Sequence, residues 1–153
     1  MAAPLEVAVT PWSSASGWQA DELCRQAEIA EQMGFHSFWL PENHFGDERS
    51  IPAPLMLLAA VAARTSRILL GSTSYLLTVR HPVLAAEEVA VLDKLSGGRV
   101  ILGVGRGIQD SVFKAFKLPT AEKRKVFQAN LELMLRAWHG EPIVEEDGSE
   151  AVR

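Results

Sequence analysis

The sequence predicts an α/β fold built from four successive strand–helix units. Four short, apolar, strand-like runs begin at Leu5, Ser37, Ile68 and Val100, so their starts lie 32, 31 and 32 residues apart. The runs are apolar almost throughout, which is typical of parallel strands covered on both faces. Eight such units would make a TIM barrel of roughly 250 residues. An open doubly wound sheet uses the same repeat, so the period alone leaves both architectures open.

A helix-like pattern follows each strand-like run, over residues 21–34, 52–65, 82–98 and 120–140. Asp21 and Thr120 are expected N-caps, and Pro82 suits a first helical turn. Residues 108–119 show no clear helix start. The apolar positions expected to face the core are Leu23, Ala27 and Ala30, then Ala85, Val89 and Leu92, then Phe127, Leu131, Met134 and Trp138.

The loops differ in length at the two ends of the strands. The helix-to-strand turns are tight ("GFH", "TSR", "SGGR"), whereas the strand-to-helix loops are long and carry the polar and aromatic residues ("PENHFGDERS", "STSYLLTVRH"). Parallel α/β folds place their sites at the carboxyl ends of the strands. We therefore expect any active site on the long-loop side.

Composition and charge narrow the class of protein. The net charge of −4 and the lack of a basic face argue against a nucleic-acid partner. No apolar run approaches the length of a membrane span, and no signal peptide is visible. Cys24 is the only cysteine, so it is expected to be a packed thiol rather than part of a disulfide or metal site. A reducing, cytoplasmic setting fits these features best.

The glycine-rich segment "GVGRG" follows the fourth strand-like run and contains Gly103, Gly105, Arg106 and Gly107. A dinucleotide fingerprint needs a third glycine at position 108, where this chain has Ile, so that interpretation fails. Backbone N–H groups beside an arginine can still bind a phosphate. A tight turn that carries a surface arginine explains the same residues, and both interpretations stay open at this point.

A second candidate is "PENHFGD" (41–47), where Glu42, Asn43 and His44 follow the second strand-like run. A loop histidine near a carboxylate can act as an acid or base near neutral pH. A hydrogen-bonded loop histidine is the alternative. The spacing of these residues does not match a metal site.

The blocks "FWLPENHF" and "RHPVLAAEEVAVLDKLSGGRVILGVGRG" closely resemble the luciferase-like flavin monooxygenase family. The resemblance covers residues 5–140 and implies that the chain is the (βα)4 portion, the N-terminal half, of a TIM (β/α)8 barrel. It also implies an oxidoreductase that uses reduced flavin (FMN, or alternatively F420), and in many cases O2, on a small organic substrate. Residues 1–153 would be one domain, with 141–153 the start of a truncated excursion.

The same resemblance implies roles for particular residues. The arginine at position 106 is expected to hold the flavin phosphate. The third-strand residues Ser72, Thr73 and Ser74 are expected near the flavin ring, often with a non-proline cis peptide. The expected cofactor-binding residues are Arg106, Gly105, Gly107, Ser72, Thr73 and Ser74. His44 is expected to line the active site, and we group Asn43 with it as a catalytic candidate. No metal is expected.

Two departures from the family pattern weigh against full activity. Many relatives have His-His after the glutamate, whereas this chain has Asn43, and an amide cannot transfer a proton near neutral pH. Luciferase also has a reactive cysteine at the position of Gly105, so light emission is not expected. The larger departure is length, because family members generally run about twice as long and supply further phosphate and substrate contacts from the second half. The alternative to an enzyme is therefore a non-catalytic half-barrel that binds flavin or serves in assembly. In either case, open sheet edges predict a homo-oligomer or pairing with a complementary barrel half.

Overall fold

The computed structural model describes residues 5–12, 19–46, 50–144 and 150–152. The chain divides into two compact units. The first comprises Met1–Tyr75 and Val91–Val104, and the second comprises Leu76–Ala90 and Gly105–Arg153. The single domain expected for residues 1–153 stays a prediction.

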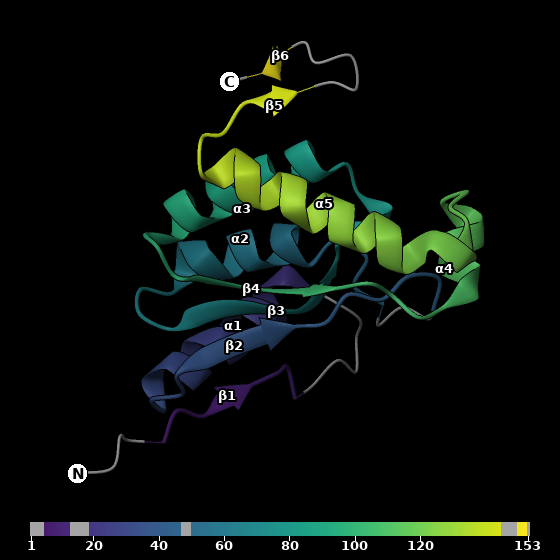
Figure 1. Ribbon diagram of the computed structural model, residues 1–153. Helices are drawn as coiled ribbons and strands as arrows, with labels where there is room; N and C mark the ends of the chain where they lie inside the picture. The colour runs from purple at the N-terminus through teal and green to yellow at the C-terminus, as the bar shows by residue number, and fades with distance from the viewer. Residues whose placement is uncertain (1–4, 13–18, 47–49, 145–149, 153) are drawn as a thin grey trace. The chain divides into compact units, whose positions relative to one another are not determined.

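A four-stranded sheet contains the predicted strands in chain order, β1-β2-β3-β4 (Figure 1). The strands are β1 (Ala8–Val9), β2 (Ser37–Leu40), β3 (Leu69–Leu76) and β4 (Val100–Gly105). β1 pairs with β2 in parallel, and β2 pairs with β3 in parallel. In the second pairing Trp39 lies opposite Gly71. The Leu70 N–H donates to the Arg99 carbonyl at 2.8 Å beside β4. Sequential parallel strands confirm the repeated strand–helix interpretation.

The first strand is shorter than the run "LEVAV" predicts. Only Ala8 and Val9 form the ladder, although the N–H of His36 also donates to the Val7 carbonyl. β1 is an edge strand, so a partner on one side alone fixes its length.

Three helices connect these strands: α1 (Ala20–Gln32), α2 (Pro54–Arg64) and α3 (Pro82–Ser96). The apolar faces expected of α1 and α3 are all buried. Gln19, rather than Asp21, precedes α1 as its N-cap, and Asp21 lies in the first turn. A carboxylate in that turn still interacts favourably with the helix dipole. Cys24 is buried in α1, and burial raises the pKa of its thiol.

The second unit contains η1 (Leu77–Val79), α4 (Asp110–Ala115), η2 (Thr120–Glu122), α5 (Lys123–Trp138) and the antiparallel pair β5 (Ile143–Val144) and β6 (Glu150–Val152). α4 was not expected, because six residues are too few to display a helical period. Thr120 begins a 3-10 turn, and Glu122 takes the N-cap position of α5. On α5, Met134 is buried as expected. Trp138 remains exposed, and its Nε1 donates to the Ala86 carbonyl.

No helix in the described parts of the chain combines the length and apolar character needed to cross a membrane.

Arg99 fastens the turn that leads into β4. Its side chain is buried, and its five N–H groups make five hydrogen bonds of 2.6–3.1 Å. The acceptors are the carbonyls of Ala62, Thr65, Ile68 and Ser96 and the Thr65 hydroxyl. Since Ala62 and Ser96 lie in the last turns of α2 and α3, one cation satisfies carbonyls at two helix ends.

Glu31 fastens the turn that leads into β3. Its carboxylate accepts the consecutive backbone N–H groups of residues 66–68 at 2.6–3.0 Å. Burial opposes ionisation of Glu31, but these N–H groups outweigh it and lower the pKa of the carboxyl.

Glu31→Gln is expected to destabilise the chain by about 1 kcal/mol at neutral pH, since charge-assisted hydrogen bonds are lost from a partly exposed site. A depressed folded-state pKa stabilises the fold above the unfolded value, and that stability is lost as pH falls through the folded value. Urea unfolding from pH 7 downward should therefore show a weaker acid dependence in the variant. Glu132→Gln, at an exposed position of α5, is the control. Parallel curves for parent and Glu31→Gln would contradict this role.

Candidate functional site

A buried acid–base pair follows β2. His44 Nε2 lies 2.8 Å from Glu42 Oε1, and the two side chains are 8% and 0% exposed. The two residues are separated only by Asn43 in the segment after β2, and their side chains meet there. The Phe45 ring lies against His44, with centroids 5.8 Å apart. The structure thus joins two of the polar residues singled out in "PENHFGD".

Asn43 faces Ile51 instead. Its N–H donates to the Ile51 carbonyl at 3.0 Å, and its Oδ1 accepts the Ile51 N–H at 2.6 Å. Ile51 is fully buried, so these two hydrogen bonds tie Asn43 to the core. The side-chain oxygen of Asn43 therefore holds the residue next to His44 in place.

The second half of β3 has the backbone feature that the resemblance implies, because the Thr73–Ser74 peptide bond is cis. Ser72 is buried and its hydroxyl donates to the Gly103 carbonyl at 3.1 Å, whereas Thr73 is exposed and Ser74 is half-buried. Ser72 thus bonds the neighbouring strand.

Trp39 lies beside these residues on the sheet. Its indole occupies the space that a side chain at Gly71 would fill, and it approaches Gly103 as well. Its Nε1 donates to the Ser37 hydroxyl at 2.7 Å. Trp39 lies between the fully buried Phe38 and Leu40 in β2, so the alternation of the strand directs it to the opposite face of the sheet.

The loop after β4 lies in the second unit. Arg106 is exposed, and its carbonyl accepts the Thr78 hydroxyl at 2.8 Å. Gly107 has a φ of +79°, which favours glycine, and a Cβ there would lie 3.2 Å from the Phe113 ring. The Thr78 hydroxyl thus holds the backbone at the exposed Arg106, and the Phe113 ring leaves no room for a side chain at Gly107.

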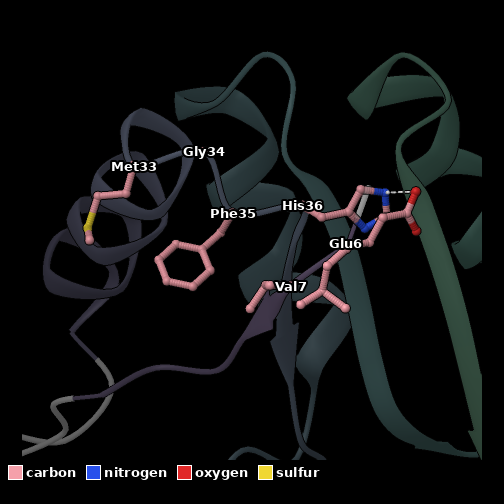
Figure 2. Close-up of a pocket in the computed structure, with 7 residues that line it drawn as sticks. Glu6, Val7, Met33, Gly34, Phe35 and His36 are labelled. Carbon is pink, nitrogen blue, oxygen red and sulfur yellow. Dashed lines mark ion pairs between the residues drawn. The ribbon is translucent and has the colours of Figure 1, made fainter. Parts of the chain in front are cut away.

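A pocket of about 460 Å³ lies elsewhere in the first unit. Figure 2 shows its lining from Glu6, Val7 and the segment Met33–His36, which lie just before β1 and β2. These are the amino ends of the strands, whereas Glu42 and His44 follow the carboxyl end of β2 and Arg106 follows that of β4. Glu6 and His36 are 3.6 Å apart and partly exposed. Within the described ranges, no three His, Cys, Asp or Glu side chains gather as a metal site would need.

Sequence reasoning did not identify two supports of these loops. The alternation of β2 could have placed Trp39 on the face opposite Phe38 and Leu40. The contact of Thr78 with the Arg106 carbonyl joins residues 28 positions apart, and no local pattern signals it.

These features define a class: a parallel α/β protein of repeated strand–helix units, with its polar loops at the carboxyl ends of the strands. The model of the luciferase-like monooxygenase family matches residues 5–152. The chain is 31% identical to limonene 1,2-monooxygenase of Rhodococcus erythropolis over 141 residues, which is 90% of this chain and 36% of that protein. It is 32% identical to an alkanal monooxygenase beta chain of Photorhabdus luminescens over 119 residues, 76% of this chain and 36% of that one.

Solved structures agree with this assignment. The monooxygenase RslO1 of Streptomyces bottropensis superposes with a TM-score of 0.83 at 32% identity, covering 95% of this chain and 46% of RslO1. The oxygenating constituent of Pseudomonas putida 3,6-diketocamphane monooxygenase, in complex with FMN, also gives 0.83, at 23% identity over 95% of this chain and 43% of that one. The F420-dependent tetrahydromethanopterin reductase of Methanopyrus kandleri gives 0.69 at 23% identity, covering 92% and 42%.

The chain belongs to the luciferase-like monooxygenase family, and its fold is a portion of the TIM barrel of those enzymes. It spans about a third of the length of the curated relatives above and less than half of the solved structures.

Proposed function

We propose that the chain forms part of a flavin-dependent monooxygenase that acts on a small organic substrate with reduced flavin and O2. The observation that carries this proposal is the Gly105–Gly107 loop. It presents the exposed Arg106 on a backbone whose carbonyl accepts a hydrogen bond from the Thr78 hydroxyl. The membership of the chain in a monooxygenase family supports it.

The residues of this loop suit the phosphate of a flavin. Arg106 offers a charged donor, and Gly105 and Gly107 leave the backbone N–H groups open to close approach. We assign Arg106, Gly105 and Gly107 to the phosphate, and Ser72, Thr73 and Ser74 to the vicinity of the ring. A bound reduced flavin would supply the electrons for the reaction.

FMN is the first choice of cofactor and F420 the alternative, because fold relatives are named with each. Both carry a phosphate beyond the ring system, so Arg106 serves either one. His44 is assigned to hold or move a proton beside the substrate, since a neutral imidazole can do both near neutral pH.

An absorption spectrum of the purified chain, recorded with and without added FMN, tests this proposal. Binding should perturb the visible absorption bands of FMN, and the FMN should elute together with the protein on gel filtration. Titration with F420 distinguishes the two cofactors. A chain that leaves both spectra unchanged would contradict the proposed function.

Arg106→Ala is expected to weaken FMN binding by about 1.5–3 kcal/mol, the range for hydrogen bonds to a charged group. The dissociation constant should rise about 10- to 150-fold, as measured by flavin fluorescence titration. Riboflavin, which lacks the phosphate, should bind parent and variant alike. Arg124→Ala, at an exposed position of α5, is the matched control. Equal losses for FMN and riboflavin would remove the phosphate assignment.

A non-catalytic flavin-binding or assembly subunit is the second candidate, and Asn43 favours it. The side-chain oxygen of Asn43 accepts the Ile51 N–H, and an amide cannot transfer a proton near neutral pH. Flavin binding without turnover of any flavin-linked substrate would support this candidate.

We further propose that the chain associates, either with a second copy or with a complementary barrel half. The two edges of the sheet, β1 and β4, support this proposal. The relatives include the beta chain and the alpha chain of alkanal monooxygenases.

A further inference from the structure

We propose that Glu42 is the positioning residue of His44: it holds the proton of the neutral ring on Nε2, so that proton uptake occurs at Nδ1. This inference rests on the proposed function for its catalytic meaning, but the tautomer itself can be measured in the chain without flavin or substrate.

The contact that carries the inference joins Glu42 Oε1 and His44 Nε2 at 2.8 Å. An ionised carboxylate only accepts hydrogen bonds, so the ring nitrogen that faces it must be the donor. The lone pair of the neutral imidazole then lies on Nδ1. When the ring takes up a proton there, the carboxylate offsets the new positive charge of the imidazolium. A buried carboxylate supports a histidine base in the same way in hydrolase triads.

Burial makes this contact more than an incidental surface pair. The Glu42 side chain is 0% exposed, and a carboxylate removed from water is costly unless hydrogen bonds compensate it. The neighbouring residue Asn43 is also held in place, because its N–H and its Oδ1 are both hydrogen-bonded to the backbone of Ile51. Glu42 therefore meets the ring from a defined backbone position at the carboxyl end of β2.

The chain provides an internal comparison. Glu6 and His36 also approach each other, but at 3.6 Å and with side chains that are 69% and 36% exposed. Exposed pairs of this kind contribute little and hold no fixed geometry. The Glu42–His44 contact is thus buried and short, whereas the same residue types form open, longer contacts at Glu6–His36 and at Glu141–His139, the latter at 3.9 Å.

Nitrogen-15 NMR of the chain labelled at histidine tests the proposal, with His44→Gln used to assign the signals. At a pH where the ring is neutral, His44 should show a protonated Nε2 whose proton exchanges slowly enough with water to be seen. Glu42→Gln, which keeps the shape and one acceptor oxygen, should weaken the protection of this proton. Glu42→Ala should abolish it. Glu6→Gln should leave the His44 signals unchanged, and His36 should show no protected ring proton.

A His44 ring protonated on Nδ1 in the parent chain would overturn the proposal, whatever the variants do. So would an unchanged protected Nε2 proton in a folded Glu42→Gln variant, with folding checked by far-UV circular dichroism. The proposed function fails separately, through the absence of flavin binding. In an active assembly, Glu42→Gln should lower kcat with little change in KM, which a purely structural role would not produce.

Discussion

Arg99→Met is expected to lower the free energy of unfolding by about 3–5 kcal/mol. The Arg99 guanidinium bonds four backbone carbonyls and one hydroxyl, and methionine fills the volume of its stem while replacing none of the bonds. A buried acceptor that loses its only strong donor costs about 1–3 kcal/mol. Since the net stability of a domain is only about 5–15 kcal/mol, the variant should be close to unfolding at room temperature.

Urea denaturation followed by circular dichroism measures this loss. Arg99→Lys keeps the charge but not the planar fork of donors, so it should recover only part of the stability. Arg67→Met, at an exposed position in the neighbouring turn, is the control and should change stability by no more than about 0.5 kcal/mol. A parent-like midpoint for Arg99→Met would show that water replaces the guanidinium without cost.

The second large effect concerns association: we expect that the chain does not persist as a monomer of 16.7 kDa. β1 and β4 are the edges of the sheet, and unpaired N–H and C=O groups at an edge invite strand pairing. Exposed apolar side chains lie beside β1, with Leu5 at 90% exposure. Light scattering at several concentrations should give a mass of at least twice the monomer value.

A charge near the edge tests where this association occurs. Leu5→Lys should shift the distribution toward the monomer, because a lysine beside an edge strand opposes pairing. Met56→Lys places the same charge at an exposed position of α2, 76% exposed, and should leave the mass unchanged. A monodisperse parent monomer with cooperative unfolding would contradict the proposed association.

Much of the fold could be predicted because the repeat is regular and because α1 and α3 bury the faces that their helical period predicts. Ala27 and Leu92 are buried where the helical period places them. Short and edge elements were predicted less well. α4 has too few residues for a period, and β1 pairs over two residues because only one neighbour defines it.

The candidate site could be predicted as a set of loops but not as a set of contacts. The sequence places Glu42, Asn43 and His44 together, yet only backbone geometry separates the acid–base pair from the amide that bonds Ile51. In the same way, Arg99 is an ordinary polar residue in the sequence. Its role depends on carbonyls at two helix ends, of which Ala62 lies 37 positions away, and a hydrogen bond of that range leaves no local signature.

The packing of Trp39 against two glycines fixes the order in which substitutions can accumulate in this lineage. A methyl group at Gly71 meets the indole, so growth at position 71 becomes possible only after position 39 has become smaller, and the reverse order passes through an overpacked intermediate. Gly103 has no such route, because the atom that a side chain would meet is the Ser72 carbonyl oxygen. A backbone atom cannot be exchanged by mutation, so position 103 must remain glycine. Position 71 can accept a larger residue, but only after Trp39 has been replaced by a smaller one.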